Sequence, residues 1–244
     1  MIRVRDSVEF GRLIKGLADD VVHANIHWKL HCDLHAALQA QPVVGNQSNT
    51  FWYLTLNAHA LTAAQYLCRA FDQQKGALSL QSWLKTIRAN LHLFDTAEFK
   101  MRLAANPFVA SLAEHPRRPD PAVLNADIRQ CSSGEPLVGK LMAYRNNVAA
   151  HRNANGTVAG TAAAFTVPVV ALEALLERSR TVLNRYSSLF AAETHSTSII
   201  GRDDYRFIFS SVADAVERSH QAMDAELARY GGDRAEGEDR RQPP

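Results

Sequence analysis

The sequence lacks an apolar run long enough to cross a membrane, which takes about 18–20 residues. Its first residues, Met1–Asp6, also lack the apolar core of a secretory signal. Cysteine is scarce: Cys32, Cys68 and Cys131 stand at wide, unrelated spacings that match neither a zinc knuckle nor a disulfide framework. We therefore expect a cytoplasmic protein in a reducing compartment, without a membrane segment.

An excess of charge of either sign is also missing. The 27 Lys and Arg residues nearly balance the 25 Asp and Glu residues, for a net charge of +2. Such a balance gives no global reason to expect nucleic acid, so an anionic ligand would have to meet a local patch. The sequence also shows no Gly-rich phosphate loop, paired-carboxylate site or nucleophile elbow, which leaves the common hydrolase and nucleotide-binding motifs without support.

Alternating apolar and polar residues, the pattern of a half-buried strand, are absent as well, and so is any internal repeat. What the chain has instead is apolar residues at three- and four-residue intervals, which is typical of amphipathic helices. A first helix is predicted over residues 7–40, ended by Pro42. We expect a loop over Val43–Gln47, then a helix from Ser48 or Asn49 with five buried apolar positions: Phe51, Leu54, Ala58, Leu61 and Cys68.

Later helices are indicated by capping residues and proline. Ser79 begins a third helix, and Asp120 before Pro121 is a start signal for another. Glu135-Pro136 opens a central helix with four buried positions expected: Leu137, Leu141, Tyr144 and Val148. After a loop over residues 153–166, a helix is predicted from Pro168 to Phe190, and a last one from Asp203 or Asp204 to about Tyr230.

These patterns predict an all-α fold, a bundle of about six to eight helices with no sheet. No change of composition forces a boundary, so residues 1–230 are expected to form a single domain. Residues 231–244 mix glycine, charge and proline, which favours a disordered C-terminal tail.

The one constellation that indicates chemistry lies in the central helix: Arg145, Asn146 and His151. Histidine titrates near neutral pH, so it can act as a general base or acid on a ribose hydroxyl. Arginine stays charged and matches phosphate oxygens, and asparagine can orient a hydroxyl. These are the side chains that RNA cleavage without a metal would use.

Helix geometry separates these groups. On a continuous α-helix, residues six apart such as Arg145 and His151 lie about 120° from each other around the axis. A bend at Asn146-Asn147, or a second copy of the helix from a partner subunit, would bring such groups together. The plainer alternative is a half-buried structural histidine and an arginine tied to a carboxylate, because so short a pattern also arises by accident.

The segment Tyr144–Asn153 resembles the arginine-polar-x4-histidine motif of the HEPN (higher eukaryotes and prokaryotes nucleotide-binding) superfamily. The wider chain, over roughly residues 6–215, is similar to HEPN-like proteins of the bacterial abortive-infection U group. Three further stretches carry that similarity: Phe51-Trp52, Leu67–Asp72 and Leu78-Ser79-Leu80.

The resemblance implies a HEPN-like helical bundle that dimerises so that the motifs of two subunits face each other. It implies a metal-independent RNA endonuclease, a toxin or defence ribonuclease in an abortive-infection or phage-defence system, without a cofactor. The expected partners are a second copy of the chain, RNA, and an antitoxin or defence protein. The alternative is a non-catalytic module of the same fold that binds RNA, a nucleotide or a partner. One departure is that Arg152-Asn153 follows His151, where toxins silenced by nucleotidylation carry a nearby tyrosine.

A second group consists of histidines four residues apart on the first predicted helix: His23, His27, His31 and His35. Neighbours at this spacing share a helix face and can chelate a metal. The competing interpretation, which we prefer, is that they follow the edge of the apolar stripe and move onto it at His35. No metal is therefore assigned.

Two weaker sets remain. A basic rim for RNA can be assembled from five scattered cations: Arg102, Arg117, Arg118, Lys140 and Arg152. Four aromatic residues fall in helical periods that favour the core over base stacking: Trp28, Trp52, Tyr53 and Trp83.

Overall fold

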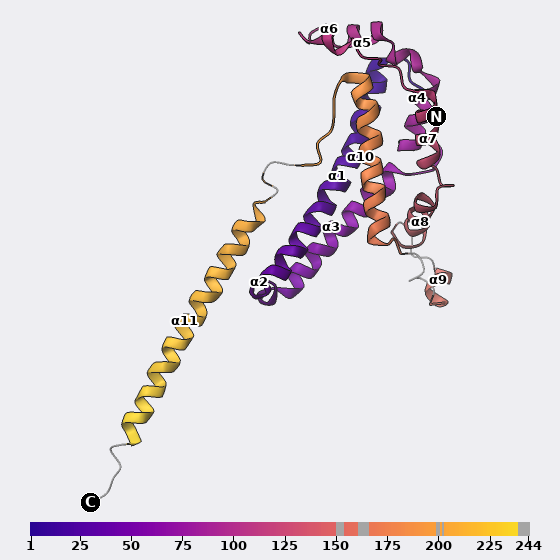
Figure 1. Cartoon of the computed structure of the whole chain (residues 1–244). Coiled ribbons are helices and arrows are strands. Elements are labelled where there is room, and N and C mark those ends of the chain that lie inside the picture. The colour runs from indigo at the N-terminus through magenta and orange to yellow at the C-terminus, as the bar shows by residue number, and fades with distance from the viewer. Residues whose placement is uncertain (150–153, 161–165, 199–200, 202, 239–244) are drawn as a thin grey trace, which may run out of the picture. The chain divides into compact units, whose positions relative to one another are not determined.

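A computed structural model describes residues 1–149, 154–160, 166–198, 201 and 203–238 (Figure 1). Within these residues every regular element is helical, which confirms the all-α fold. The elements are α1 (Ser7–Ala40), α2 (Pro42–Gln47), α3 (Asn49–Ala70), α4 (Leu80–Ala89), η1 (Leu91–Phe94), α5 (Thr96–Arg102), α6 (Val109–Leu112), α7 (Pro121–Gln130), α8 (Pro136–Tyr144), η2 (Arg145–Ala149), α9 (Ala154–Val158), α10 (Val169–Ala191) and α11 (Tyr205–Glu238). None of the described helices is long and apolar enough to cross a bilayer.

The helices group into two compact units. The first unit comprises Met1–Lys29 and Ala58–Ile199, and the second comprises Leu30–Asn57 and Ile200–Pro244. The boundary between the units falls inside α1 and inside α3, so each of these helices contributes residues to both units. The single domain expected over residues 1–230 stays a prediction.

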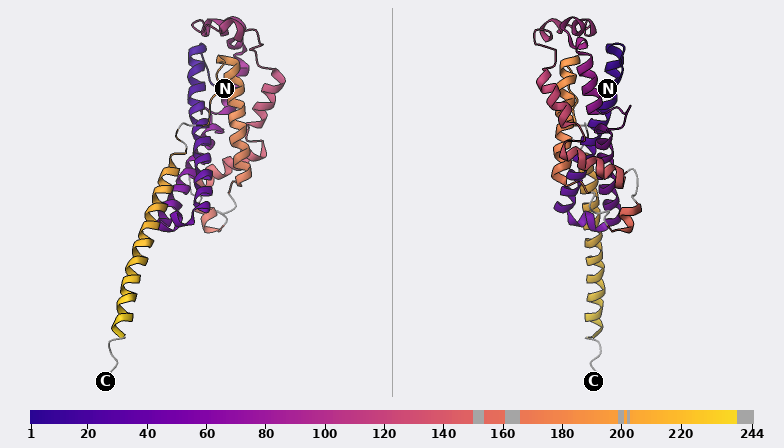
Figure 2. Two further views of the ribbon diagram at one scale, coloured as in Figure 1. Left: turned by 60° about the vertical axis from the view of Figure 1, so that its left-hand side comes forward. Right: turned by 90° about the vertical axis from the view of Figure 1, so that its right-hand side faces the viewer.

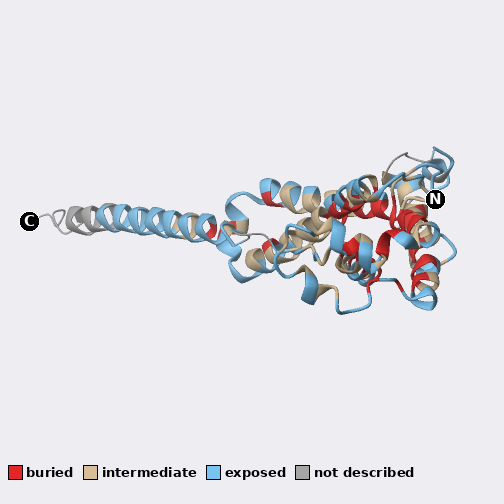
Figure 3. Ribbon diagram, turned by 90° about the horizontal axis from the view of Figure 1, so that it is seen from above, coloured by how far each residue is buried: buried red, intermediate tan, exposed pale blue. Residues whose placement is uncertain are grey.

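The core of the first unit is rich in aromatic rings. Phe10 of α1 lies 4.8 Å from Phe190 of α10 and 5.6 Å from Phe94, measured between ring centroids, and Trp83 of α4 meets Tyr186 of α10 edge-on at 5.9 Å. Both views in Figure 2 show α10 alongside the first part of α1. Figure 3 shows in red where the buried residues lie along the ribbon. Packing of this kind makes α1, α4 and α10 the frame of the unit.

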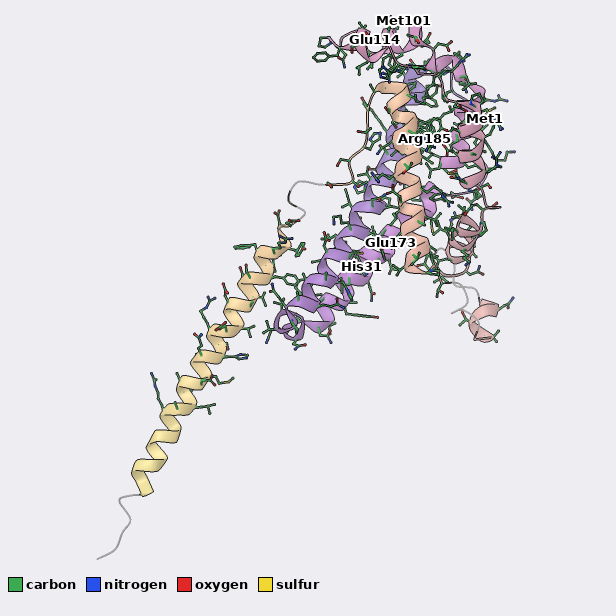
Figure 4. All side chains as sticks on the ribbon, in the orientation of Figure 1. Met1, His31, Met101, Glu114, Glu173 and Arg185 are labelled. Atoms are coloured by element: carbon green, nitrogen blue, oxygen red, sulfur yellow. The ribbon has the colours of Figure 1, made fainter. Side chains whose placement is uncertain are left out.

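A buried carboxylate ties α7 to this frame. Asp127 is 5% exposed, accepts a 2.8 Å hydrogen bond from the Tyr186 hydroxyl and pairs with Arg185, which is labelled in Figure 4. Burial and the bond to Asp127 raise the pKa of Tyr186. A buried charge is tolerated only when it is paired and hydrogen-bonded, as Asp127 is here.

The second unit has a smaller core where α1 ends, α2 turns and α3 begins. Its fully enclosed members are Leu34, Val44, Trp52 and Phe209. The rings of Trp52 and Phe209 lie 5.0 Å apart, which places the start of α11 against α3 within this unit.

Several expectations from the sequence need correction. Residues 43–47 are helical rather than a loop, because Pro42 is pre-organised for a first helical turn and Val44 anchors that turn in the core. Helix α9 lies in the expected loop over residues 153–166, and α11 continues past Tyr230 to Glu238. The tail beyond residue 238 lies outside the described residues.

The face assigned to α3 was also wrong. Three apolar residues expected in the core are more than half exposed: Phe51, Leu54 and Leu61. Ala58 is exposed as well, whereas Cys68 is buried as expected. The other buried positions are Trp52, Ala63, Leu67 and Ala70. Apolar residues stand on several sides of this helix, so a period alone does not say which side is covered.

Candidate functional site

Helix α8, which leads to the arginine-histidine motif, is held firmly at its start. The Glu135 carboxylate accepts hydrogen bonds from the amides of Leu137 (2.9 Å) and Val138 (3.0 Å), so it caps the helix. It also pairs at 3.0 Å with Arg178 of α10. Burial acts to raise the pKa of Glu135, but the bonds from Arg178 and the two amides prevail and lower it. The carboxylate therefore stays ionised and fixes where α8 begins.

The body of α8 packs into the first unit through Val138, Leu141 and Met142, all buried. Leu137 and Tyr144 pack partly buried against the same core, as expected. Val148 is 45% exposed, so its expected burial is wrong. The reason is a change of helical period in the turn that contains it.

That change is a π-helical turn, η2, over Arg145–Ala149. Its i→i+5 bonding adds a residue to the turn and shifts the side chains that follow by about one position around the axis. Asn147 supports it with a hydrogen bond from Nδ2 to the Ala143 carbonyl at 2.8 Å. The motif thus begins where the α-helix ends, and single π turns inside helices occur frequently at functional sites.

Arg145 is anchored by a residue far away in sequence. Its Nη2 donates to Asp72 Oδ2 at 3.0 Å, and its Nη1 donates to Asn146 Oδ1 at 3.2 Å. The Asp72 and Arg145 side chains are 13% and 22% exposed, so this ion pair is partly buried. A guanidinium has five N–H donors, which leaves three of Arg145's donors unused by the described contacts.

An open pocket of about 300 Å³ adjoins this pair. Its lining includes Asp72, Gln73, Met142, Arg145 and Asn146. Gln73 donates through Nε2 to the carbonyls of Phe71 (2.7 Å) and Cys131 (3.1 Å), which holds the segment after α3 in place. The pocket therefore presents one fixed cation and the exposed amide of Asn146.

Two groups with nucleophilic chemistry near Arg145, Cys68 and Tyr144, are kept in their protonated forms by burial. Burial raises the pKa of the Cys68 thiol to about 12, although the charge of Arg145 acts in the opposite direction. Burial likewise raises the pKa of Tyr144. Neither side chain supplies an anion for nucleophilic attack, because the thiolate and not the thiol is the reactive form of cysteine.

Of the three residues assigned from the sequence, the structure brings together two. Arg145 and Asn146 meet at the pocket, while His151 lies outside the described residues, as does Arg152. Sequence reasoning missed Asp72 as the partner of Arg145. Asp72 closes the Leu67–Asp72 stretch that carries part of the family resemblance, and this was the available signal.

The histidines of α1 form local contacts rather than a common cluster. His27 Nδ1 lies 2.9 Å from His59 Nδ1 of α3, and His31, labelled in Figure 4, lies 3.0 Å from the Leu56 carbonyl through Nδ1. His35 is exposed, so its expected place on the apolar stripe is wrong. No group of three or more His, Cys, Asp or Glu side chains converges as a metal site among the residues described.

The basic rim does not form as a set. Arg117 is buried, donates to the Ser188 carbonyl at 3.1 Å and lies over the Phe99 ring, so its role is structural. Arg102 is likewise occupied by main-chain carbonyls.

Among the aromatic residues, Trp52 and Trp83 are buried as expected and Trp28 is partly buried, whereas Tyr53 is 63% exposed.

Comparison with known protein families gave a match over most of the chain. A family model described as AbiU2, with the label HEPN_AbiU2, matches residues 7–208. The matched range includes Asp72, Arg145, Asn146 and His151. Searches of curated proteins and of solved structures returned no significant match.

Proposed function

Because the chain belongs to the HEPN AbiU2 family, which suggests a defence context, we propose that it is a metal-independent RNA endonuclease of an abortive-infection or phage-defence system. In this proposal the active site is composite and lies at a homodimer interface. One subunit contributes a motif of Arg145, Asn146 and His151, and its partner contributes the same motif.

The proposed reaction is an in-line attack of a ribose 2′-hydroxyl on the adjacent phosphate. His151 removes the hydroxyl proton as general base, and the partner's His151 gives a proton to the 5′-oxygen that leaves. Arg145 stabilises the charge that develops on the pentacoordinate phosphate, and Asn146 orients the reacting groups. The products are a 2′,3′-cyclic phosphate and a 5′-hydroxyl.

The observation that best supports this function is the way the Arg145 guanidinium is held in place. Its guanidinium is held by Asp72 and Asn146 at an open pocket, and contacts with the described residues occupy only two of its five donors. An arginine fixed in advance loses less conformational freedom when it meets an anion, which is how electrostatic preorganisation lowers a barrier.

The decisive test is cleavage of RNA by single variants. His151→Ala should lower the rate at least 100-fold, in line with the ~10²–10⁴ that a positioned acid or base supplies. Arg145→Ala should do the same, and Arg145→Lys should rescue only in part, because lysine lacks the planar fork. Cleavage should persist in excess EDTA and show a bell-shaped pH profile.

Arg180→Ala is the matched control, since among the described residues Arg180 pairs with the neighbouring Glu177 on the surface of α10. Its cleavage rate should equal that of the wild type. Wild-type protein that cleaves no RNA, together with a His151→Ala variant that mainly loses stability, would refute the endonuclease.

The second candidate is a non-catalytic module of the same fold that binds RNA, a nucleotide or a partner protein. The Arg145–Asp72 ion pair favours it, because a partly buried pair is also what a purely structural arginine forms. Binding of RNA without cleavage, weakened by Arg145→Ala, would establish this function instead.

A further inference from the structure

A second pocket of about 410 Å³ lies in the first unit, away from the motif. We call it the α1–α10 pocket, because it is lined mainly by the first turns of α1 and the end of α10. Five of its lining residues are apolar: Val8, Ile14, Leu103, Phe190 and Ala191. Ile14 and Phe190 belong to the buried core, so the pocket has an apolar base.

Cationic side chains also line this pocket. Arg12 and Lys15 are exposed residues of α1, and Arg102 comes from α5. The single carboxylate among the lining residues is Glu193, so three cations face one anion, an excess of two positive charges (3 − 1) before His195 is counted. The combination of an apolar base and a cationic lining fits neither plain water nor a wholly apolar ligand.

Arg102 is the most unusual of these groups. Its Nε and Nη2 donate to the Phe190 carbonyl at 3.1 and 2.7 Å, and its guanidinium lies 3.6 Å from the centroid of the Phe190 ring. Its Nη1 is buried without a hydrogen-bond partner, and no carboxylate forms an ion pair with Arg102 among the described residues. Burial lowers its pKa, as expected for a charge removed from water, while the charge of Glu98, which lies too far away for an ion pair, acts in the opposite direction.

His195, which follows the turn at the end of α10, is a second lining residue with an unsatisfied nitrogen. Its Nε2 is also buried without a hydrogen-bond partner. Its main chain is fixed by Asn184 of α10, which accepts from the His195 amide at 2.7 Å and donates to the His195 carbonyl at 3.3 Å. The turn itself uses Ala192 at φ 54°, a left-handed conformation that is unfavourable for a residue other than glycine. The segment is thus held in a specific, strained position over the pocket.

We propose that the α1–α10 pocket binds an amphipathic organic anion, with an apolar body on Phe190 and Ile14 and a phosphate or carboxylate group near Arg102, Arg12 and Lys15. A buried cation that no described carboxylate contacts is costly, and a buried polar nitrogen without a hydrogen bond costs further free energy. An anionic headgroup offsets the charge of Arg102. The site is independent of Arg145 and of the proposed cleavage reaction.

The test uses two probes with the same two-ring body, 1-naphthyl phosphate and 1-naphthoate, titrated into the full-length protein by calorimetry. At least one should bind stoichiometrically and raise the melting temperature, and the stronger of the two identifies the headgroup. Neutral 1-naphthol lacks the anionic group, and inorganic phosphate lacks the apolar body. Each should bind at least tenfold more weakly.

Two variants locate the binding. The double variant Arg12→Gln/Lys15→Gln changes two exposed residues and should therefore keep the fold. Its affinity for the anion should fall about tenfold or more, because two cationic contacts are lost. Gly11→Leu introduces a side chain at a lining position, where a Cβ would lie 3.9 Å from the Phe190 ring, and should abolish binding. Lys100→Gln, an exposed lysine of α5 outside the lining, is the control.

The proposal is overturned if neither anion binds, if naphthol binds as tightly as the anions, or if the double glutamine variant binds like the wild type. Should Gly11→Leu fail to fold, the double variant decides alone. RNA cleavage by the wild type is measured separately, so that a failure here leaves the endonuclease proposal unaffected.

Discussion

At the scale of single residues, Asp72 has the clearest consequence for function. Its carboxylate orients Arg145, yet it also competes with any phosphate for the same guanidinium. In an endonuclease the orientation of Arg145 matters more, whereas in a binding module the competition with phosphate matters more. Replacing Asp72 therefore distinguishes the two proposed functions and leaves Arg145, Asn146 and His151 unchanged.

We expect Asp72→Asn to lower kcat for RNA cleavage about tenfold while KM changes little, because the guanidinium loses its charged anchor and its alignment in the transition state. Asp224→Asn, the same chemical change at an exposed position of α11, serves as control. In a module that only binds, Asp72→Asn should instead tighten RNA binding, since the competing carboxylate is gone. Cleavage kinetics and equilibrium binding measured on the same variant distinguish these results.

A second residue-scale prediction concerns the contact of His27 with His59. Their Nδ1 atoms lie 2.9 Å apart, so one ring must be neutral to accept the proton of the other. Burial, then the charges of His59 and His23, lower the pKa of His27. The unfolded chain therefore binds this proton more readily, and the stability that neutral His27 contributes is complete above the unfolded pKa of about 6.5 and is lost as pH falls below it.

Urea unfolding at pH 7.5 and pH 5.5 measures this effect. The wild type should lose more stability between the two conditions than His27→Gln does. His220→Gln, at an exposed histidine of α11, should leave the difference unchanged. Equal losses in the wild type and in His27→Gln would show that the pair does not carry the pH dependence.

At the scale of elements, the start signals of helices were read correctly. Ser79 accepts a hydrogen bond from the Ser82 amide, and Asp120 accepts from the amides of Ala122 and Val123. Glu135 caps α8 in the same manner. Capping depends on residues within one turn of each other, so a linear sequence contains all that is needed to recognise it.

The cap of α8 is also predicted to matter energetically. Glu135→Ala should lower the free energy of unfolding by about 1–2 kcal/mol, the usual cost of a lost cap, because two amides lose their acceptor and Arg178 loses its partner. Glu177→Ala, which removes a surface pair with Arg180, should change stability by less than about 0.5 kcal/mol. Urea denaturation of both variants gives the comparison. A loss no larger for Glu135→Ala than for Glu177→Ala would contradict the assigned role.

At the scale of the whole molecule, the proposed function requires two chains. We expect a symmetric dimer whose interface lies near residues 137–152. Val148 is a suitable probe, because it is a 45% exposed apolar side chain within the π-helical turn. Val148→Glu should give a monomer by light scattering at micromolar concentration and should lose RNA cleavage.

The control is Val123→Glu, a 40% exposed valine on α7, which should remain dimeric. A wild type that is monomeric at micromolar concentration would contradict both the interface and the composite site. A Val148→Glu variant that stays dimeric would move the interface elsewhere.

The sequence by itself determined the helical character, most helix starts, and the motif residues, because periodicity, capping and the motif are local in the chain. Only the tertiary structure decided which sides of those helices are covered. Phe51, Leu54 and Leu61 look like core residues by spacing and are exposed, because burial depends on which other element packs there. The partner of Arg145 is likewise a long-range matter: Asp72 lies 73 residues away, and no local rule connects the two.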